Sequence, residues 1–494
     1  MREAIRFTFI AGCIILLIIG IIIWPLPGCI ALAAMLFFIG MYDLFQKKHT
    51  ILRNFPVLGH IRYLFEMIAP EIHQYFVESD TDGKPINRNM RSYIYERAKE
   101  QNQTHPFGTE LDVYADTYKW MQHSIYPAKK LETQPRITIG GKDCKKPYSA
   151  SLFNISAMSF GALSKNAIQA LNLGAKAGNF FHDTGEGGIS KYHLQGGDLV
   201  WEIGTGYFGC RAADGRFDAE KYREKALLDQ VKMIEIKISQ GAKPGHGGVL
   251  PAAKNNEEIA EIRGVPPHTI VLSPPGHSAF SDAEGLLHFI QHLRELSGGK
   301  PVGFKLAIGS TKEFIEICAK MKETGIQPDF ITVDGAEGGT GAAPIDFSNY
   351  VGMPWEDALI FVVDTLKKYD LKDNIKVITA TKIFTAFDMF KAFCIGADIC
   401  NSARGMMLAL GCIQALKCNT NACPTGVATN DPRLVRGLVV SEKWKRVQNY
   451  HKHILDDFLE LLAASGCSST DQLNRSLIYK KVNNSWVTYA ALYP

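Results

Sequence analysis

The chain has 494 residues, of which 46% are hydrophobic and 21% charged, a composition typical of a globular protein with a substantial core. Its 54 basic and 50 acidic residues give a formal net charge of +4, which argues against a nucleic-acid-binding surface. The 11 cysteines are odd in number and irregularly spaced, which argues against a secreted disulfide scaffold and places the catalytic part in a reducing compartment.

The N-terminal segment, residues 1–45, is strongly apolar. Residues 7–42 contain no Asp, Glu, Lys or Arg, and the sequence WPLPG at 24–28 interrupts the run. We therefore predict a transmembrane hairpin of two short helices, 7–24 and 28–44, in contact with membrane lipid. Basic residues flank both ends and place both on the cytoplasmic side: Arg2, Arg6, Lys47, Lys48 and Arg53. The alternative is a signal peptide, although no small-x-small cleavage site precedes the second apolar run.

Residues 46–105 are predicted to form a helical linker, and residues 441–494 a C-terminal helical segment. Between them, from Pro147 onward, short β-branched or aromatic runs alternate with helical patterns. The runs are 153–158, 179–184, 232–237, 269–273, 301–306, 329–334, 376–380 and 398–402. Eight such repeats predict an α/β protein with a (β/α)8 TIM barrel, with a doubly wound sheet as the alternative.

Unusual residues gather just after these runs. SFGALS, GEGG, KPGHGG and GAEGGTGAAP follow four of them. In a barrel of this kind the chemistry collects on the loops after the strands, so we expect these segments to form the active site.

Three cysteines, Cys412, Cys418 and Cys423, follow the eighth run with the spacing C-x5-C-x4-C, and a proline comes after the last. The spacing alone leaves an iron–sulfur cluster, a zinc site and three buried thiols open. Zinc usually takes four ligands, and no fourth Cys or His lies nearby in the sequence. A proline after the last cysteine is familiar from bacterial ferredoxins.

The motifs SAMSFGALS, DTGEGG, QGAKPGHGG, VDGAEGGTGAAP and CPTGVAT, in this order, resemble the FMN-binding synthase domain of glutamate synthase over residues 106–440. The similarity is greatest to the shorter, stand-alone FMN-binding glutamate synthase family proteins. The resemblance implies a (β/α)8 barrel, FMN and a [3Fe-4S] cluster held by the three cysteines. It also implies reduction of 2-iminoglutarate, formed from 2-oxoglutarate and ammonia, to L-glutamate.

A flavin needs backbone N–H groups and a cation for its phosphate, and close backbone around its ring. Lys305 ends the fifth run, where a cation could stabilise negative charge on the N1–C2=O edge of reduced flavin. The candidate FMN-binding residues are Met158, Ser159, Lys305, Asp334, Gly338, Gly339, Thr340, Lys382, Arg404 and Gly405.

The resemblance also implies a substrate pocket. Lys243 and Arg263 match positions that hold the carboxylates of 2-oxoglutarate, and Met158 matches a position near the substrate. Glu186 matches an acidic residue beside the substrate carbon and is a candidate general acid, so Glu186 and Lys305 are the expected catalytic pair.

On the substrate side two positions depart from the family pattern: Val249 replaces a usual Gln and Gly264 a usual Asp. An imino acid other than 2-iminoglutarate is therefore an alternative substrate, as in an N-substituted glutamate synthase component. A non-catalytic membrane redox subunit is the other alternative. In the phosphate loop Thr381 and Ala386 also depart from the family pattern.

The sequence carries no convincing NAD(P) or FAD fingerprint and no amidotransferase nucleophile. We therefore expect ammonia to be free or delivered by a partner. Electrons are expected from an external donor: ferredoxin, a reductase subunit or a membrane donor. The expected location is the cytoplasmic membrane, with the catalytic domain facing the cytoplasm.

Overall fold

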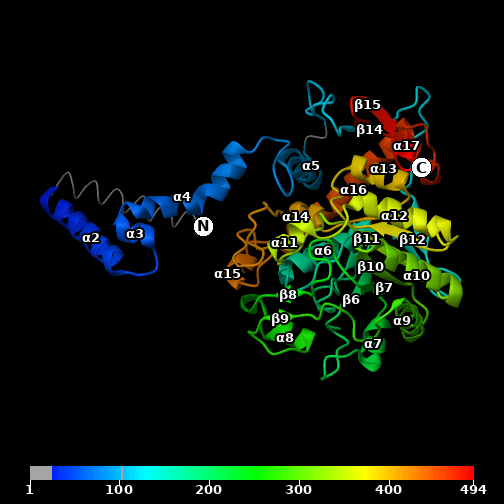
Figure 1. The fold of residues 1–494 in the computed structure, drawn as a ribbon, viewed down its shortest axis with the longest axis horizontal. Helices are drawn as coiled ribbons and strands as arrows, with labels where there is room; N and C mark the ends of the chain where they lie inside the picture. Colours follow the sequence, from blue (N-terminus) through cyan, green and yellow to red (C-terminus); the bar gives the residue numbers. More distant parts are fainter. Residues whose placement is uncertain (1–24, 102–103) are drawn as a thin grey trace. The chain divides into compact units, whose positions relative to one another are not determined.

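The computed structural model describes residues 25–101 and 104–494, which divide into two compact units, Met1–Arg88 and Asn89–Pro494 (Figure 1). The described part of the first unit is helical. Its elements are α2 (Pro25–Phe45), α3 (Thr50–Asn54), α4 (Gly59–Ile72) and the π-helical turn η1 (His73–Val77).

Helix α2 coincides with the second helix of the predicted hairpin, 28–44. Pro25 and Pro27 of WPLPG lie at its N-terminal end, next to residues that lie outside the described part of the chain. Near the other end, Asp43 is buried and accepts hydrogen bonds from the Val57 N–H (2.9 Å) and the His60 ring (3.0 Å). Over 25–101 and 104–494 no helix is long and apolar enough to cross a membrane, and the predicted span 7–24 lies outside the described residues. The transmembrane hairpin is therefore not supported.

The second unit is built on a closed barrel of eight parallel strands, which confirms the predicted (β/α)8 fold. The strands are β4 (Phe153–Ile155), β5 (His182–Asp183), β6 (Leu199–Ile203), β7 (Val231–Lys237), β10 (Val302–Ala307), β11 (Phe330–Asp334), β12 (Lys376–Thr379) and β13 (Ile399–Ser402). Strand β13 pairs with β4, so the sheet closes and leaves no open edge.

Helices surround the barrel (Figure 1). Several begin at side-chain caps: Ser164 accepts from the Ala167 N–H at the start of α6, and Thr385 and Asp388 form a capping box on α13. The helices are α5 (Arg88–Lys99), α6 (Lys165–Gly178), α7 (Ala219–Ala226), α8 (Glu257–Arg263), α9 (Ala283–Leu296), α10 (Thr311–Thr324), α11 (Ile345–Tyr350), α12 (Trp355–Lys368), α13 (Ala386–Ile395), α14 (Arg404–Leu410), α15 (Pro432–Val435), α16 (Val440–Ala464) and α17 (Tyr489–Leu492).

One predicted strand run is wrong and one barrel strand was missed. Only Val271–Leu272 of the run 269–273 is a strand, β9, and it pairs antiparallel with β8 (Val249–Leu250) outside the barrel. Leu272 is 63% exposed, so this apolar run is not a core strand. The missing strand is β6, whose five residues are all buried.

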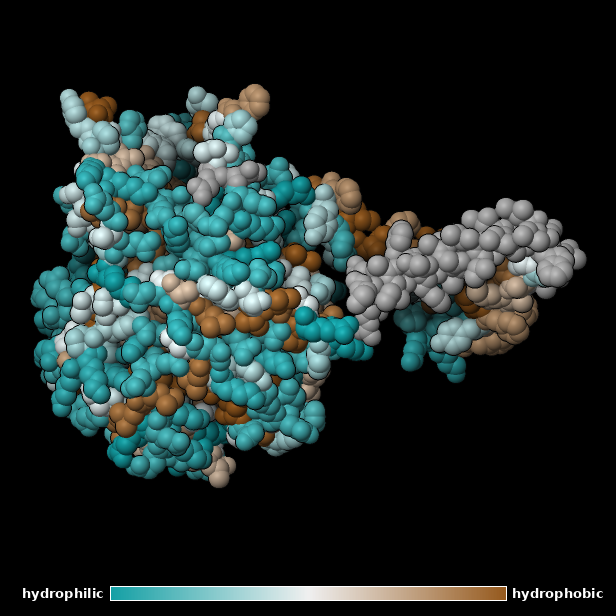
Figure 2. Space-filling view, turned by 180° about the vertical axis from the view of Figure 1, so that it is seen from behind, coloured by the Kyte–Doolittle hydropathy of each residue, from teal (hydrophilic) through white to brown (hydrophobic). Residues whose placement is uncertain are grey.

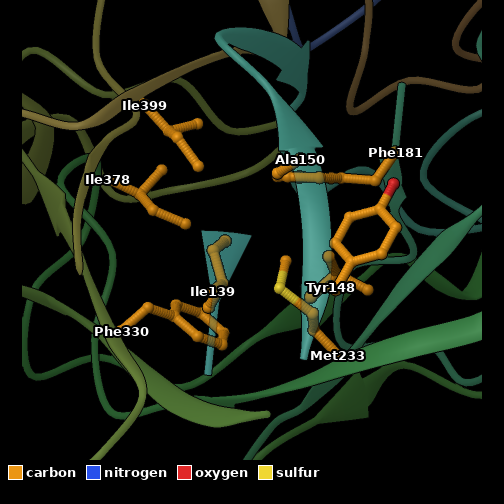
Figure 3. Close-up of a cluster of buried hydrophobic side chains, with 9 residues drawn as sticks. Ile139, Tyr148, Ala150, Phe181, Met233, Phe330, Ile378 and Ile399 are labelled. Atoms are coloured by element: carbon orange, nitrogen blue, oxygen red, sulfur yellow. The ribbon is translucent and has the colours of Figure 1, made fainter. Parts of the chain in front are cut away.

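The N-terminal end of the barrel is closed by a hairpin of β2 (Arg136–Ile139) and β3 (Tyr148–Ser151). Its side chains Ile139, Tyr148 and Ala150 join inward residues from the beginnings of the barrel strands in one core cluster (Figure 3). The strand-side members are Phe181, Val200, Met233, Phe330, Ile378 and Ile399. With this end filled by apolar side chains, the C-terminal ends of the strands are left for a polar site.

The C-terminal segment is only partly helical as predicted. Helix α16 packs against α6, but β14 (Ile478–Val482) and β15 (Ser485–Thr488) form a hairpin that β1 (Lys119–Met121) extends to three strands. Asn483 and Asn484 both have positive φ, 49° and 59°, as a two-residue hairpin turn of matching twist requires. The view in Figure 2 shows a mostly hydrophilic surface over the barrel unit.

Candidate active site

The motif residues converge because each follows the C-terminal end of a barrel strand. Met158 comes after β4, Glu186 after β5 and Lys243 after β7; Asp334 ends β11, and Arg404 begins α14 after β13. Parallel strands present these ends on one face of the barrel.

Lys305, on β10, lies inside the barrel and is 5% exposed. Its Nζ is 2.7 Å from Oε2 of Glu202 and 4.0 Å from Oε1 of Glu235. Burial alone would lower the pKa of Lys305, but Glu202, Glu235, Asp183 and Asp334 outweigh it and raise that pKa, so the ammonium form is fixed. Sequence reasoning missed Glu202 and Glu235, although a charged residue inside a buried strand (LVWEI, KMIEIK) is the signal that could have found them.

Glu186 is surrounded by cations. Its Oε1 lies 3.1 Å from Nζ of Lys237, another residue that sequence reasoning missed. Burial would raise the pKa of Glu186, but Lys237, Lys243 and Arg263 together hold it below its usual value. Glu186 is therefore ionised in the unliganded site, where it balances the charge of these cations.

Lys243 and Arg263 lie on the same side as Glu186. Lys243 is 3% exposed and donates to the carbonyl of Ala342 at 2.9 Å, and burial lowers its pKa to about 8. Arg263 donates to the Phe160 carbonyl at 3.3 Å, and burial lowers its pKa to about 10. The Nε of Arg263 has no partner in the described part of the chain. Two buried cations with unused donor capacity can hold an anionic ligand.

The two residues that depart from the family pattern on the substrate side, Gly264 and Val249, lie in defined elements. Gly264 is the C-cap of α8 with φ 64°, a left-handed conformation that suits glycine, so it ends the helix that carries Arg263. Val249 lies in the short strand β8.

The glycine-rich loop after β11 is tied to two neighbouring loops. Asp334 accepts from the Gly241 N–H at 2.9 Å and from the Thr381 hydroxyl, which itself accepts from the Gly335 N–H at 2.6 Å. A Cβ on Gly241 would lie 1.6 Å from the carbonyl oxygen of Gly335, so no side chain fits at that position. These contacts place the loops after β7, β11 and β12 close together.

Arg404 reaches the same loop, where it donates to the carbonyl of Glu337 at 2.6 Å. A Cβ on Gly339 would lie 2.7 Å from its Nε, so the glycine lets backbone and guanidinium approach. Burial lowers the pKa of Arg404, and Asp334 and Glu337 oppose that shift.

The remaining residues predicted to bind the cofactor lie on the loops that follow the barrel strands. A Cβ added to Gly338 would lie 2.9 Å from Oδ1 of Asp334, and Thr340 is exposed. Lys382 has a φ of 48°, and Gly405 packs against the hydroxyls of Ser402 and Tyr450. Ser159 lies 3.5 Å from Arg263, and Met158 is 7% exposed and donates its N–H to the Asp183 carbonyl.

The three cysteines occupy one loop with an unusual backbone. Gln414, Leu416 and Asn421 all have positive φ (56°, 53° and 60°), which costs energy for residues with side chains and marks functional loops. The Cys412 thiol interacts electrostatically with both Cys418 and Cys423.

The protonation chemistry of the three thiols differs. Burial raises the pKa of Cys412 to about 12 and raises that of Cys418. Burial would also raise the pKa of Cys423, but the Thr425 hydroxyl and backbone N–H groups of the turn after it stabilise the thiolate and lower that pKa.

Lys254, which was not predicted from the sequence, stabilises the cysteine loop. Its buried Nζ donates to the carbonyls of Ala162, Cys418 and Ala428. It therefore joins the loop after β4 to both ends of the segment that holds Cys418 and Cys423. The Asn430 amide adds bonds to the carbonyls of Gly161 and Lys254, both at 3.0 Å.

These residues fit the two expected cofactors. The Lys305 ammonium and the close-packed glycine loop with Arg404 suit the ring and phosphate of a flavin. Three thiols on one loop, with N–H groups directed at Cys423, suit an iron–sulfur cluster.

Comparisons with known proteins identify the family. Residues 92–468 match the family described as "Conserved region in glutamate synthase". The chain is 38% identical over 502 residues to the glutamate synthase large subunit-like protein YerD of Bacillus subtilis, covering 93% of this chain and 95% of that protein. It is 35% identical to an archaeal glutamate synthase [NADPH] of Methanocaldococcus jannaschii, covering 65% of this chain and 60% of that protein.

Among solved structures, flavocytochrome b2 with bound pyruvate superposes with a TM-score of 0.44 at 12% identity, covering 84% of this chain and 85% of that one. The glutamate synthase [NADPH] large chain of Azospirillum brasilense is 30% identical over 65% of this chain, which spans only 20% of that larger protein. With the family match extending over most of the barrel unit, the chain belongs to the glutamate synthase family.

Proposed function

We propose that the chain is a glutamate synthase-type oxidoreductase that reduces 2-iminoglutarate, formed from 2-oxoglutarate and ammonia, to L-glutamate. The observation that supports this proposal most directly is a group of buried cations around Glu186 at the C-terminal face of the barrel: Lys237, Lys243 and Arg263. A dicarboxylate substrate needs such cations in a closed pocket. Family membership supports an oxidoreductase acting on CH–NH2 donors.

FMN would supply hydride chemistry at this site, and a [3Fe-4S] cluster would supply single-electron transfer. Cys412, Cys418 and Cys423 would hold the cluster. Lys305 would stabilise negative charge on a reduced flavin, and Arg404 would hold its phosphate. The electrons come from an external donor such as ferredoxin, a reductase subunit or a membrane donor.

The substrate carboxylates bind Arg263 and the lysines beside Glu186. Adding hydride to the imine carbon also requires a proton at nitrogen, and the donor must carry that proton at working pH. Lys243, with a pKa of about 8, meets this condition, whereas Glu186 is ionised and holds the lysines in place.

A direct test is anaerobic purification in detergent, followed by flavin absorbance, iron analysis and EPR. We expect stoichiometric FMN, a three-iron signal and loss of the reduced-flavin spectrum when 2-oxoglutarate and ammonia are added together. Omission of ammonia is the control. Absence of bound flavin would refute the proposal.

A different imino acid remains the second candidate, because Val249 and Gly264 replace polar groups that the family usually carries. In the same assay, reoxidation by another 2-oxo acid and amine, without any by 2-oxoglutarate and ammonia, would favour that substrate.

Replacing Lys243 by Met should lower kcat, because the proposed proton donor is lost. It should also raise the KM for the 2-oxo acid about 10- to 150-fold, the effect of losing one charge-assisted hydrogen bond of about 1.5–3 kcal/mol. In the wild type, kcat/KM should fall as the pH rises through about 8, because Lys243 of the free enzyme then loses its proton. Steady-state kinetics from pH 6 to 9.5 measure these effects. The exposed Lys322→Met serves as the control, and an unchanged KM in Lys243→Met would contradict the assignment.

Replacing Lys254 by Met should loosen the cysteine loop, since three buried carbonyls lose their shared donor. Leaving buried carbonyls without a donor costs about 1–3 kcal/mol, which should weaken the affinity of the loop for the cluster about 5- to 150-fold. Iron and acid-labile sulfide analysis and EPR measure this loss, while FMN content should be unchanged. Lys417→Met, an exposed lysine on the same loop, is the matched control. Full iron content in Lys254→Met would show that the loop needs no such anchor.

The chain is further proposed to work at the cytoplasmic membrane, with the barrel unit facing the cytoplasm and the N-terminal segment in contact with lipid. Support comes from the charge-free run 7–42 and from exposed aromatic side chains on α2, including Phe37, Phe38 and Phe45. The full chain should sediment with membranes after a high-salt wash and be extracted by detergent. Recovery in the soluble fraction would contradict this location.

A further inference from the structure

Three buried carboxyl groups crowd together in the barrel interior. Asp183 on β5, Glu202 on β6 and Glu235 on β7 are each at most 2% exposed, and their nearest oxygens lie within 4.8 Å of one another. Glu202 and Glu235 are direct partners in the pairing of β6 with β7. The network therefore follows from strand register.

The three carboxyl groups differ in their hydrogen-bond and ion-pair partners. Glu202 forms the 2.7 Å ion pair with Lys305, and Asp183 accepts from the Gly185 N–H at 2.9 Å. Glu235 accepts from the Thr332 hydroxyl through Oε2, but its Oε1 is buried and has no hydrogen-bond partner in the described part of the chain. Lys305, at 4.0 Å, is too far from Oε1 to donate.

Both the charge balance and the hydrogen bonding of the cluster indicate that one of the carboxyl groups is protonated. Three carboxylates would face the ammonium of Lys305, since the nearby Lys237 is 4.0 Å from Glu202 and is already paired with Glu186 at 3.1 Å. An uncompensated buried charge is costly. One proton removes one negative charge and supplies the donor that Oε1 of Glu235 lacks. We propose that Asp183 and Glu235 share one proton beneath Lys305, as a buried proton store that sets the charge around this lysine.

The direction of the pKa shifts agrees. Burial, followed by the charges of Glu235 and Glu202, raises the pKa of Asp183 well above its usual value. Burial raises the pKa of Glu235 to about 7, against the opposing charge of Lys305. The charged groups that act on the pair are Glu202 on β6 and Lys305 on β10. Around these two lie Lys237 on β7, which is 4.0 Å from Glu202 and paired with Glu186, and Asp334 on β11, which acts on Lys305.

The store acts through Lys305, so Asp183 and Glu235 are positioning residues. This step rests on the proposed function, in which Lys305 faces the flavin. With the proton present, Glu202 and the shared pair carry two negative charges in total. When it is lost at high pH, a third negative charge lies near Lys305 and opposes negative charge on bound reduced FMN.

The store is tested without any cofactor by infrared spectroscopy of the full-length apoprotein. The wild type should show the carbonyl stretch of a protonated carboxyl group at pH 6, and the band should fade as the pH rises through about 7. Glu235→Gln should abolish the band, since it reproduces the charge of the protonated pair. A band that persists in Glu235→Gln, or is absent from the wild type, would overturn the proposal.

Asp183→Asn gives an independent variant if Glu235→Gln does not fold, because the asparagine oxygen can still accept from Gly185. It too should remove the band. Glu323→Gln, a carboxylate on α10 that pairs with Lys320 at the surface, should leave the band unchanged.

The action on Lys305 is tested in the holoenzyme by the midpoint potential of FMN between pH 6 and 9. Above about pH 7 the wild-type potential should fall more steeply than that of Glu235→Gln. Equal slopes would overturn the action on the flavin site. Absence of FMN refutes the proposed function instead, while the infrared result still decides whether the proton is stored.

Discussion

The ammonium of Lys305, held among carboxylates in the middle of the barrel, is the interaction on which the rest of the site depends. A buried charge is tolerated only where partners surround it, and here neighbouring strands supply them at fixed register. Thr332 pairs with Lys305 across β10 and β11, and Glu235 pairs with Glu202 across β6 and β7. Such precision comes from strands; flexible loops could not hold like charges this close.

The same strands build an apolar layer below the charged one. On β7, Met233 belongs to the core cluster, and Glu235 and Lys237 follow it at steps of two residues. On β11, Phe330 belongs to the cluster and is followed at the same step by Thr332. Successive inward positions of a strand climb the barrel axis, so alternation places apolar side chains at the closed end and charged ones toward the site. The β2–β3 hairpin keeps water from the lower layer.

Much of this was open to prediction from sequence. Repeating strand and helix patterns predicted the barrel, and the glycine and cysteine motifs predicted which loops carry the site. The charged layer was missed because Glu202 lies in a strand that was overlooked and Glu235 was read only as part of a run. Burial of Asp43 depends on tertiary contacts that hydropathy does not record. The backbone of the cysteine loop was equally hidden, since nothing about Leu416 suggests a positive φ.

The cysteine loop and the substrate side of the site share one support. Lys254 and Asn430 bind the carbonyls of Ala162 and Gly161, in the loop whose preceding residue, Phe160, receives a hydrogen bond from Arg263. These buried hydrogen bonds join two side chains to main-chain carbonyls and so couple the cysteine loop to the backbone beside Arg263. The segment proposed to receive electrons and the guanidinium proposed to hold the substrate are therefore fixed to the same short stretch of chain after β4. Lys254 is central to this support, because its ammonium also interacts electrostatically with the Cys418 and Cys423 thiols.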